Sequence, residues 1–127
     1  MSFLNIIKKP KTPKVDFDGI NGHLSIYGVS VPENPNVFYE PLIDWLKKYL
    51  KSPQKNTQLD FKLSYVNTSS LQYIYDFLML LDDADGKKTK VKVNWYFLKD
   101  DSDTKEMGED FKAAVKLEFS FIGVKDI

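Results

Sequence analysis

The residues best suited to carry chemistry are three consecutive hydroxyl side chains, Thr68, Ser69 and Ser70, in the stretch YVNTSSLQYIYDF. They stand where a predicted strand ends and a predicted helix begins. A helix start carries partial positive charge and unpaired backbone N–H groups, so it tolerates a phosphoryl group. One hydroxyl is enough to cap a helix, a contribution of about 1 kcal/mol. Two interpretations stay open: helix capping alone, or a reversible phosphorylation site.

The helix that follows, expected over residues 70–82, carries two apolar stripes. The first suffices to cover one face of a sheet and consists of Leu71, Ile74, Tyr75, Leu78 and Leu81. The second lies on another face and consists of Tyr73, Phe77 and Leu80. It is either covered by the amino-terminal segment or exposed as a partner-binding patch. In the second case these residues, with Asn67, form a partner surface that phosphate at the helix start would switch.

Other candidate sites have simpler interpretations. The single histidine, His23, lies in or beside a hairpin, and the sequence has no G-x-S-x-G motif to pair with it. The acidic stretch DDSDTKEMGED lacks the glycine spacing of a calcium loop, and DGKKTK lacks the pattern of a phosphate-binding loop. We therefore expect a surface or strand histidine, a solvated acidic segment and a turn, with no metal or cofactor site.

Composition excludes several classes of protein. The 127 residues include 18 basic and 18 acidic side chains, and every basic residue is lysine. A balanced charge without arginine argues against nucleic-acid binding. The absence of cysteine excludes disulfides, thiolate zinc sites and cysteine nucleophiles. No apolar run is long enough for a signal peptide or a membrane span, so we expect a cytoplasmic protein that binds no membrane.

The pattern of apolar residues predicts strands alternating with helices. A hairpin is expected over residues 12–31, with Val15 and Phe17 on one strand and Leu24, Ile26 and Val29 on the other. A helix capped by Asn34 or Asn36 follows up to residue 50, with a kink or restart at Pro41. Three further strands are expected over residues 59–66, 89–98 and 116–124, and a short helix over 104–114. In the strand over 59–66, the core face consists of Leu59, Phe61, Leu63 and Tyr65.

The resulting order, ββαβαβαβ, is typical of an α/β fold in which crossover helices pack on a mixed sheet. The length suits a single domain over residues 1–127.

Several stretches together resemble the SiaC family of bacterial regulatory phosphoproteins. They are GVSVPENPNVFYEPLIDWLKKYL, LDFKLSYVNTSSLQYIYDFLMLL, VKVNWYF and DDSDTKEMGEDF, in that order between residues 28 and 121. The resemblance implies a STAS-like (SpoIIAA-like) fold, similar to that of anti-sigma factor antagonists. It places the phosphoacceptor on Thr68, with Ser69 and Ser70 as the alternatives.

The resemblance also implies a function and a set of partners. These are a Ser/Thr protein kinase, a PP2C-like phosphatase and a signalling target, a diguanylate cyclase in characterised members, which links the family to c-di-GMP and biofilm formation. We therefore expect a partner-switching protein without catalytic activity. Two alternatives remain: a small hydrolase using the acidic segment or His23, or a passive interaction domain whose hydroxyl triplet only caps a helix.

Overall fold

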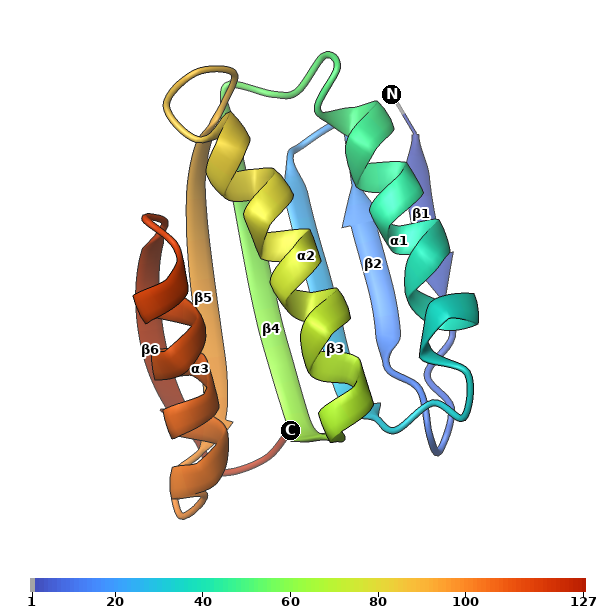
Figure 1. The fold of residues 1–127 in the computed structure, drawn as a ribbon, viewed down its shortest axis with the longest axis vertical. Helices are drawn as coiled ribbons and strands as arrows, with labels where there is room; N and C mark the ends of the chain where they lie inside the picture. The colour runs from blue at the N-terminus through green and yellow to red at the C-terminus, as the bar shows by residue number, and fades with distance from the viewer. Residues whose placement is uncertain (1) are drawn as a thin grey trace.

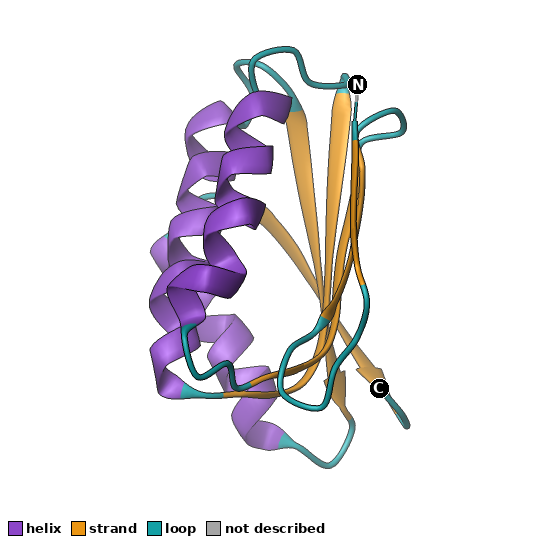
Figure 2. Cartoon of the chain, turned by 90° about the vertical axis from the view of Figure 1, so that its right-hand side faces the viewer, coloured by secondary structure: helices purple, strands orange, loops and turns teal. Residues whose placement is uncertain are grey.

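The computed structural model describes residues 2–127, which form a six-stranded sheet with three helices on one of its faces. Figure 2 shows this division into two layers, with the other face of the sheet left uncovered by helices. The elements are β1 Phe3–Ile6, β2 Lys14–Asp18, β3 His23–Ser30, α1 Pro35–Tyr49, β4 Asn56–Val66, α2 Thr68–Ala84, β5 Lys90–Leu98, α3 Ser102–Ala114 and β6 Glu118–Val124.

The strands lie in the sheet in their chain order, β1 to β6. β1, β2 and β3 are antiparallel neighbours, whereas β3, β4, β5 and β6 are parallel and joined by crossover helices. The carboxyl ends of β3, β4 and β5 therefore meet at one edge of the sheet, where α1, α2 and α3 begin. We call this the carboxyl edge; it is the lower end of the molecule in Figure 1.

The predicted α/β class with a mixed sheet is confirmed, but the predicted element order is wrong at its start. β1 precedes the hairpin and pairs antiparallel with β2, with Leu4 opposite Phe17. It has only four residues, and only Leu4 and Ile6 are partly buried, so it leaves almost no alternating pattern in the sequence. α1 runs through Pro41 without a break, contrary to the predicted restart. The likeness to STAS domains stays a prediction.

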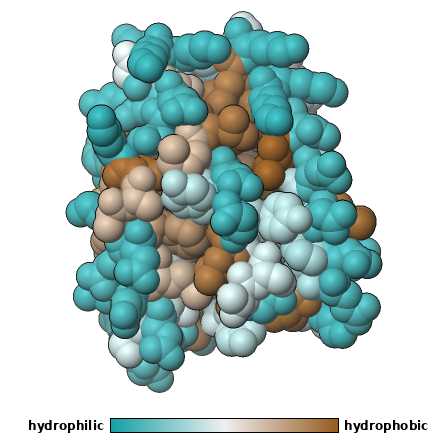
Figure 3. Space-filling model, viewed as in Figure 1, coloured by the Kyte–Doolittle hydropathy of each residue, from teal (hydrophilic) through white to brown (hydrophobic). Residues whose placement is uncertain are grey.

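Aromatic side chains dominate the core between the sheet and the helices. Phe17 of β2 lies 5.1 Å from Trp45 of α1 and 5.6 Å from Phe77 of α2, measured between ring centroids. Trp95 of β5 lies 5.7 Å from Phe111 of α3. Aromatic pairs at these separations stabilise a core beyond the area they bury. On the outer surface of the helical layer, apolar and hydrophilic side chains alternate in patches (Figure 3).

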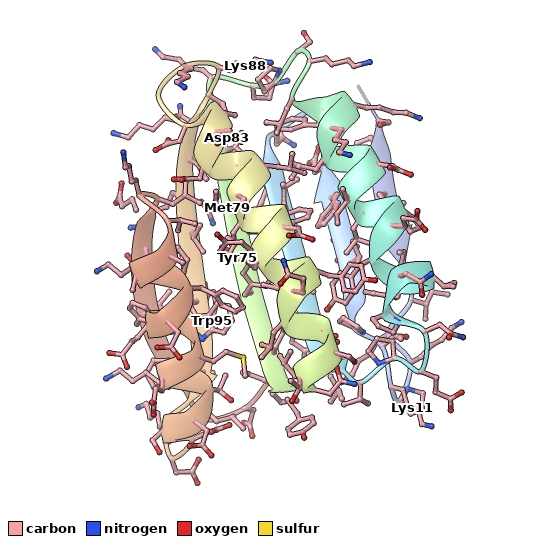
Figure 4. All side chains as sticks on the ribbon, viewed as in Figure 1. Lys11, Tyr75, Met79, Asp83, Lys88 and Trp95 are labelled. Carbon is pink, nitrogen blue, oxygen red and sulfur yellow. The ribbon has the colours of Figure 1, made fainter. Side chains whose placement is uncertain are left out.

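Trp95 fixes the position of α3 on the sheet. Its indole Nε1 donates a hydrogen bond of 2.9 Å to the carbonyl oxygen of Thr104, and the ring is fully buried. Gly108 lies against the indole so closely that a Cβ atom there would be 2.6 Å from Cδ1 of Trp95. Figure 4 labels Trp95 beside α3, on the side that faces α2. Gly108 and Phe111, both in the stretch DDSDTKEMGEDF, thus serve to pack α3 on the sheet.

We predict that Gly108→Ala lowers the free energy of unfolding by about 1–3 kcal/mol, because the added methyl group overlaps the indole ring of Trp95, which is fully buried and tightly packed. Urea denaturation measures the change. Glu106→Ala, on the exposed side of the same helix, is the control and should change stability by less than about 0.5 kcal/mol. Equal effects of the two substitutions would contradict this account of α3 packing.

Candidate phosphorylation site

The candidate site lies where β4 passes into α2 at the carboxyl edge. Asn67 is the N-cap of α2, and its Oδ1 accepts hydrogen bonds from the backbone N–H of Ser70 at 3.1 Å and from Ser70 Oγ at 2.6 Å. The cap is therefore not one of the three hydroxyl residues, contrary to the capping interpretation of the triplet; asparagine is an equally good cap and already satisfies the free N–H group. Thr68 and Ser69 occupy the first helical positions and are exposed.

Ser70 differs from its two neighbours because it is fully buried. Since Ser70 Oγ donates to Asn67, it accepts from Ser30 Oγ at 3.0 Å, and Ser30 in turn contacts the hydroxyl of Tyr39. Tyr39 is thus the donor at the far end of a buried chain of hydroxyl groups that stops at the cap. Burial raises the pKa of Tyr39, against the opposing effect of its hydrogen bonds to Ser30 and Ser70. The fully buried Ser70 hydroxyl is not accessible to a kinase in the folded protein.

Tyr65 is exposed, although the alternation of β4 predicts it on the core face. Leu63 pairs with Gly28 of β3 and Tyr65 pairs with Val29, so Ser64 is an extra residue in β4. Such a bulge shifts the alternation of buried and exposed side chains by one residue. Tyr65 is therefore 59% exposed, and the next residue, Val66, is buried. An aromatic side chain therefore projects from the surface two residues before the cap of α2.

The second apolar stripe of α2 is covered rather than exposed as a whole. Phe77 is 1% exposed and packs on Phe17 of β2, so its predicted role in direct partner binding is wrong. Tyr73 is half-buried and stacks on Tyr39 of α1, with ring centroids 5.5 Å apart. Leu80 is also half-buried. The stripe was misjudged because the sequence does not show that α1 and β2 converge on this side of α2.

On the face of the sheet without helices, His23 belongs to a polar cluster around Asp60. His23 Nε2 lies 2.8 Å from Asp60 Oδ2, and Asp60 Oδ1 accepts from Asn94 at 2.9 Å and from Gln58 at 3.1 Å. Burial alone would raise the pKa of Asp60, but hydrogen bonds from His23, Asn94 and Gln58 outweigh it and lower that pKa. These partners are an imidazole and two amides, none of which is an activated nucleophile.

The acidic segment expected to be solvated forms the start of α3. Asp101 is the N-cap, and its carboxylate accepts hydrogen bonds from the backbone N–H of Thr104 at 3.1 Å and from Thr104 Oγ1 at 2.7 Å. Within residues 2–127, no group of three or more acidic, histidine or cysteine side chains could hold a metal ion. Over the same residues, every helix is too short or too polar to cross a membrane.

We predict that Thr68→Ala changes the free energy of unfolding by less than about 1 kcal/mol, since Asn67 supplies the cap. Phe77→Ala should cost about 3–5 kcal/mol because it leaves a cavity in the core. Phe3→Ala is the matched control at a phenyl group that is 54% exposed. Urea denaturation of the three variants tests this. A small loss of unfolding free energy for Phe77→Ala would contradict the placement of Phe77 in the core.

A second prediction concerns acid stability. Asp60 has a lowered pKa in the folded state, so its contribution to stability is fully present above its ordinary pKa of 3.8 and is lost as the pH falls through the folded-state value. Asp60→Asn should therefore destabilise the protein at neutral pH, and the difference from wild type should shrink below about pH 4. Urea denaturation between about pH 3 and 7 measures it, with the exposed Asp100→Asn as control. A difference that does not vary with pH would contradict the assignment.

Comparison with known proteins places this geometry in a family. The family model for the SiaC family regulatory phosphoprotein matches residues 6–124. An uncharacterized protein of Pseudomonas aeruginosa strain UCBPP-PA14 is 32% identical over 120 residues, which is 94% of this chain and 95% of that protein.

Solved structures agree. Apo-SiaC from Pseudomonas aeruginosa superposes with a TM-score of 0.87 at 33% identity, covering 97% of this chain and all of the other. A second match is found in the crystal structure of the diguanylate cyclase SiaD in complex with its activator SiaC, from the same species. It has a TM-score of 0.88 at 31% identity and covers 95% of this chain and 99% of the matched chain. This chain therefore belongs to the SiaC family of regulatory phosphoproteins and is a regulator rather than an enzyme.

Proposed function

We propose that this protein is a partner switch in which reversible phosphorylation of Thr68 controls binding to a signalling target. The observation that carries the proposal is the exposed Thr68 at the first position of α2, beside a cap made by another residue. Because Asn67 and the buried Ser70 hold the helix start, a phosphoryl group on Thr68 changes the surface charge without removing a structural contact.

We assign the phosphate to an exposed hydroxyl group rather than to one whose hydrogen bonds hold the helix start in place. Ser70 is buried and hydrogen-bonded, which argues against it, and Ser69 is exposed like Thr68. The family motif N-T-S-S favours Thr68 over Ser69. A phosphate there brings about −1.5 to −2 charges next to the positive end of the helix, which tolerates them.

The proposed partners follow from the family. A SiaC protein of Pseudomonas aeruginosa is an activator of the diguanylate cyclase SiaD and forms a complex with it. We propose a diguanylate cyclase as the target here as well, with a Ser/Thr kinase adding the phosphate and a PP2C-like phosphatase removing it. Regulation of a cyclase would place this protein in c-di-GMP signalling in the cytoplasm.

The proposal predicts that phosphorylation of Thr68 weakens target binding. Burying a dianion in an interface without a cationic partner is costly, and even about 3 kcal/mol reduces affinity more than a hundredfold. Titration of a candidate diguanylate cyclase with unmodified and phosphorylated protein, followed by calorimetry, measures the effect. Thr68→Asp should reproduce it only in part, since it brings one charge.

Two controls separate the possible acceptors and the passive alternative. Thr68→Ala should abolish phosphate incorporation by the partner kinase, seen by intact mass, whereas Ser69→Ala should leave it intact. Phosphate found only on Ser69 would contradict Thr68 as the acceptor and assign that role to Ser69. Equal target affinity of the modified and unmodified forms would leave the chain a passive interaction domain and reject the switch.

A further inference from the structure

We infer that the target docks in an apolar groove at the carboxyl edge, beside the start of α1, and that the docking segment of the target carries apolar side chains flanked by carboxylates. This inference rests on the proposed function, whose partner it describes further. It replaces the second stripe of α2 as the main partner surface, because Phe77 of that stripe is buried.

The groove has a volume of about 420 Å³ and lies between the loop that joins β1 to β2 and the first two turns of α1. Its apolar lining comes from Ile6, Pro32, Val37, Phe38 and Pro41. Figure 4 labels Lys11 in the loop next to the start of α1.

The exposure of Val37 and Pro41 is unusual for a helix of this kind. They are four residues apart on one outward side of α1, and Val37 is 66% exposed. Ile7, next to the groove-lining Ile6, is 81% exposed. An outward helix side normally carries charge, as Glu40 and Asp44 do further around α1. Apolar side chains gathered around a groove are typical of an interaction site.

The charges around the groove favour an acidic partner. Lys9 and Lys11 line it against a single carboxylate, that of Glu33, which forms an ion pair of 2.9 Å with Lys11. The chain leading into it, KKPKTPK over residues 8–14, contains no acidic residue. Lys11 is paired with Glu33 and Lys14 with Asp16, so the excess positive charge among the lining residues is that of Lys9. One excess positive charge beside an apolar floor favours a segment in which carboxylates flank apolar side chains.

The hollow between α1 and α2 has the opposite character. It is lined by Ile43, Met79 and Leu80, with Asp76 and Asp83 against the single Lys47. Figure 4 shows Met79 and Asp83 well along α2, away from its first turn. A phosphate at Thr68 would act on this hollow only across several helical turns. Its acidic lining and its distance from the phosphoacceptor make it the weaker candidate for a phosphate-controlled interface.

Backbone hydrogen bonds connect the groove to the phosphorylation site. The N–H of Val31 donates to the carbonyl of Lys11 at 2.8 Å, and the N–H of Asn67 donates to the carbonyl of Ser30 at 2.9 Å. The loop after β3 thus joins the groove on one side to the cap of α2 on the other. Phosphate on Thr68 lowers the positive potential along this same edge, so it opposes the carboxylates that the lysines attract.

The test compares target binding by Val37→Asp with that by Ile20→Asp. Both substitutions place one carboxylate at an exposed apolar side chain, but Ile20, 52% exposed, lies in the turn between β2 and β3 at the opposite edge of the sheet. Val37→Asp should weaken binding to the candidate diguanylate cyclase at least about tenfold, and Ile20→Asp should change it less than about twofold. Thermal denaturation verifies that both variants remain folded.

A charge variant tests the acidic nature of the partner. Lys9→Gln should lower the affinity and also reduce its dependence on salt between about 50 and 300 mM, since one attractive charge is removed. Unchanged affinity of both Val37→Asp and Lys9→Gln, with wild-type protein binding normally, overturns the groove and leaves the proposed function standing. Failure of the wild-type protein to bind the candidate diguanylate cyclase would contradict both the docking groove and the proposed function. A change in oligomeric state in Val37→Asp, without a change in target affinity, would assign the groove to a second copy of this chain and also overturn the inference.

Discussion

The cap that Asn67 forms on α2 is the interaction on which the candidate site depends. Its side-chain oxygen accepts from both the backbone and the hydroxyl of Ser70, and through Ser70 it is connected to Ser30 and Tyr39. The end of β3, the start of α1 and the start of α2 are therefore held by one buried set of hydrogen bonds. Leaving any of these buried groups unpaired would cost more than the bond itself contributes.

This arrangement divides the N-T-S-S block by task. Asn67 and Ser70 hold the helix, while Thr68 and Ser69 between them point to solvent. Consecutive positions in the first turn of a helix project in different directions, so one short motif can supply both a buried anchor and an exposed acceptor. A modification confined to the exposed pair changes charge while the anchor stays intact, which is the property a reversible switch requires.

Much of the fold followed from the sequence because the apolar periods of its helices and parallel strands are clear. What the sequence could not reveal were features set by tertiary context. Tyr65 is exposed because Ser64 is an extra residue in β4. This extra residue can be recognised only from the pairing of β4 with β3. The burial of Phe77 depends on where Phe17 lies, and the choice of Asn67 over a serine as cap depends on a buried partner, Ser30, 40 residues from Ser70 along the chain. In the site, residue types were recognised correctly, but their division into buried and exposed roles required the structure.

The carboxyl edge unites the remaining observations by electrostatics. Parallel strands bring the positive ends of α1 and α2 to one side of the molecule, and the lysine-rich loop after β1 lies beside them. The apolar groove opens on this same side, and its charged lining consists of Lys9, Lys11 and Glu33. A phosphate on the exposed Thr68 would add negative charge at this edge, and the cap that Asn67 and Ser70 form does not involve the Thr68 side chain. Under the proposed function, binding control of this kind needs no second conformation, since the charge added at the edge would itself oppose an acidic partner.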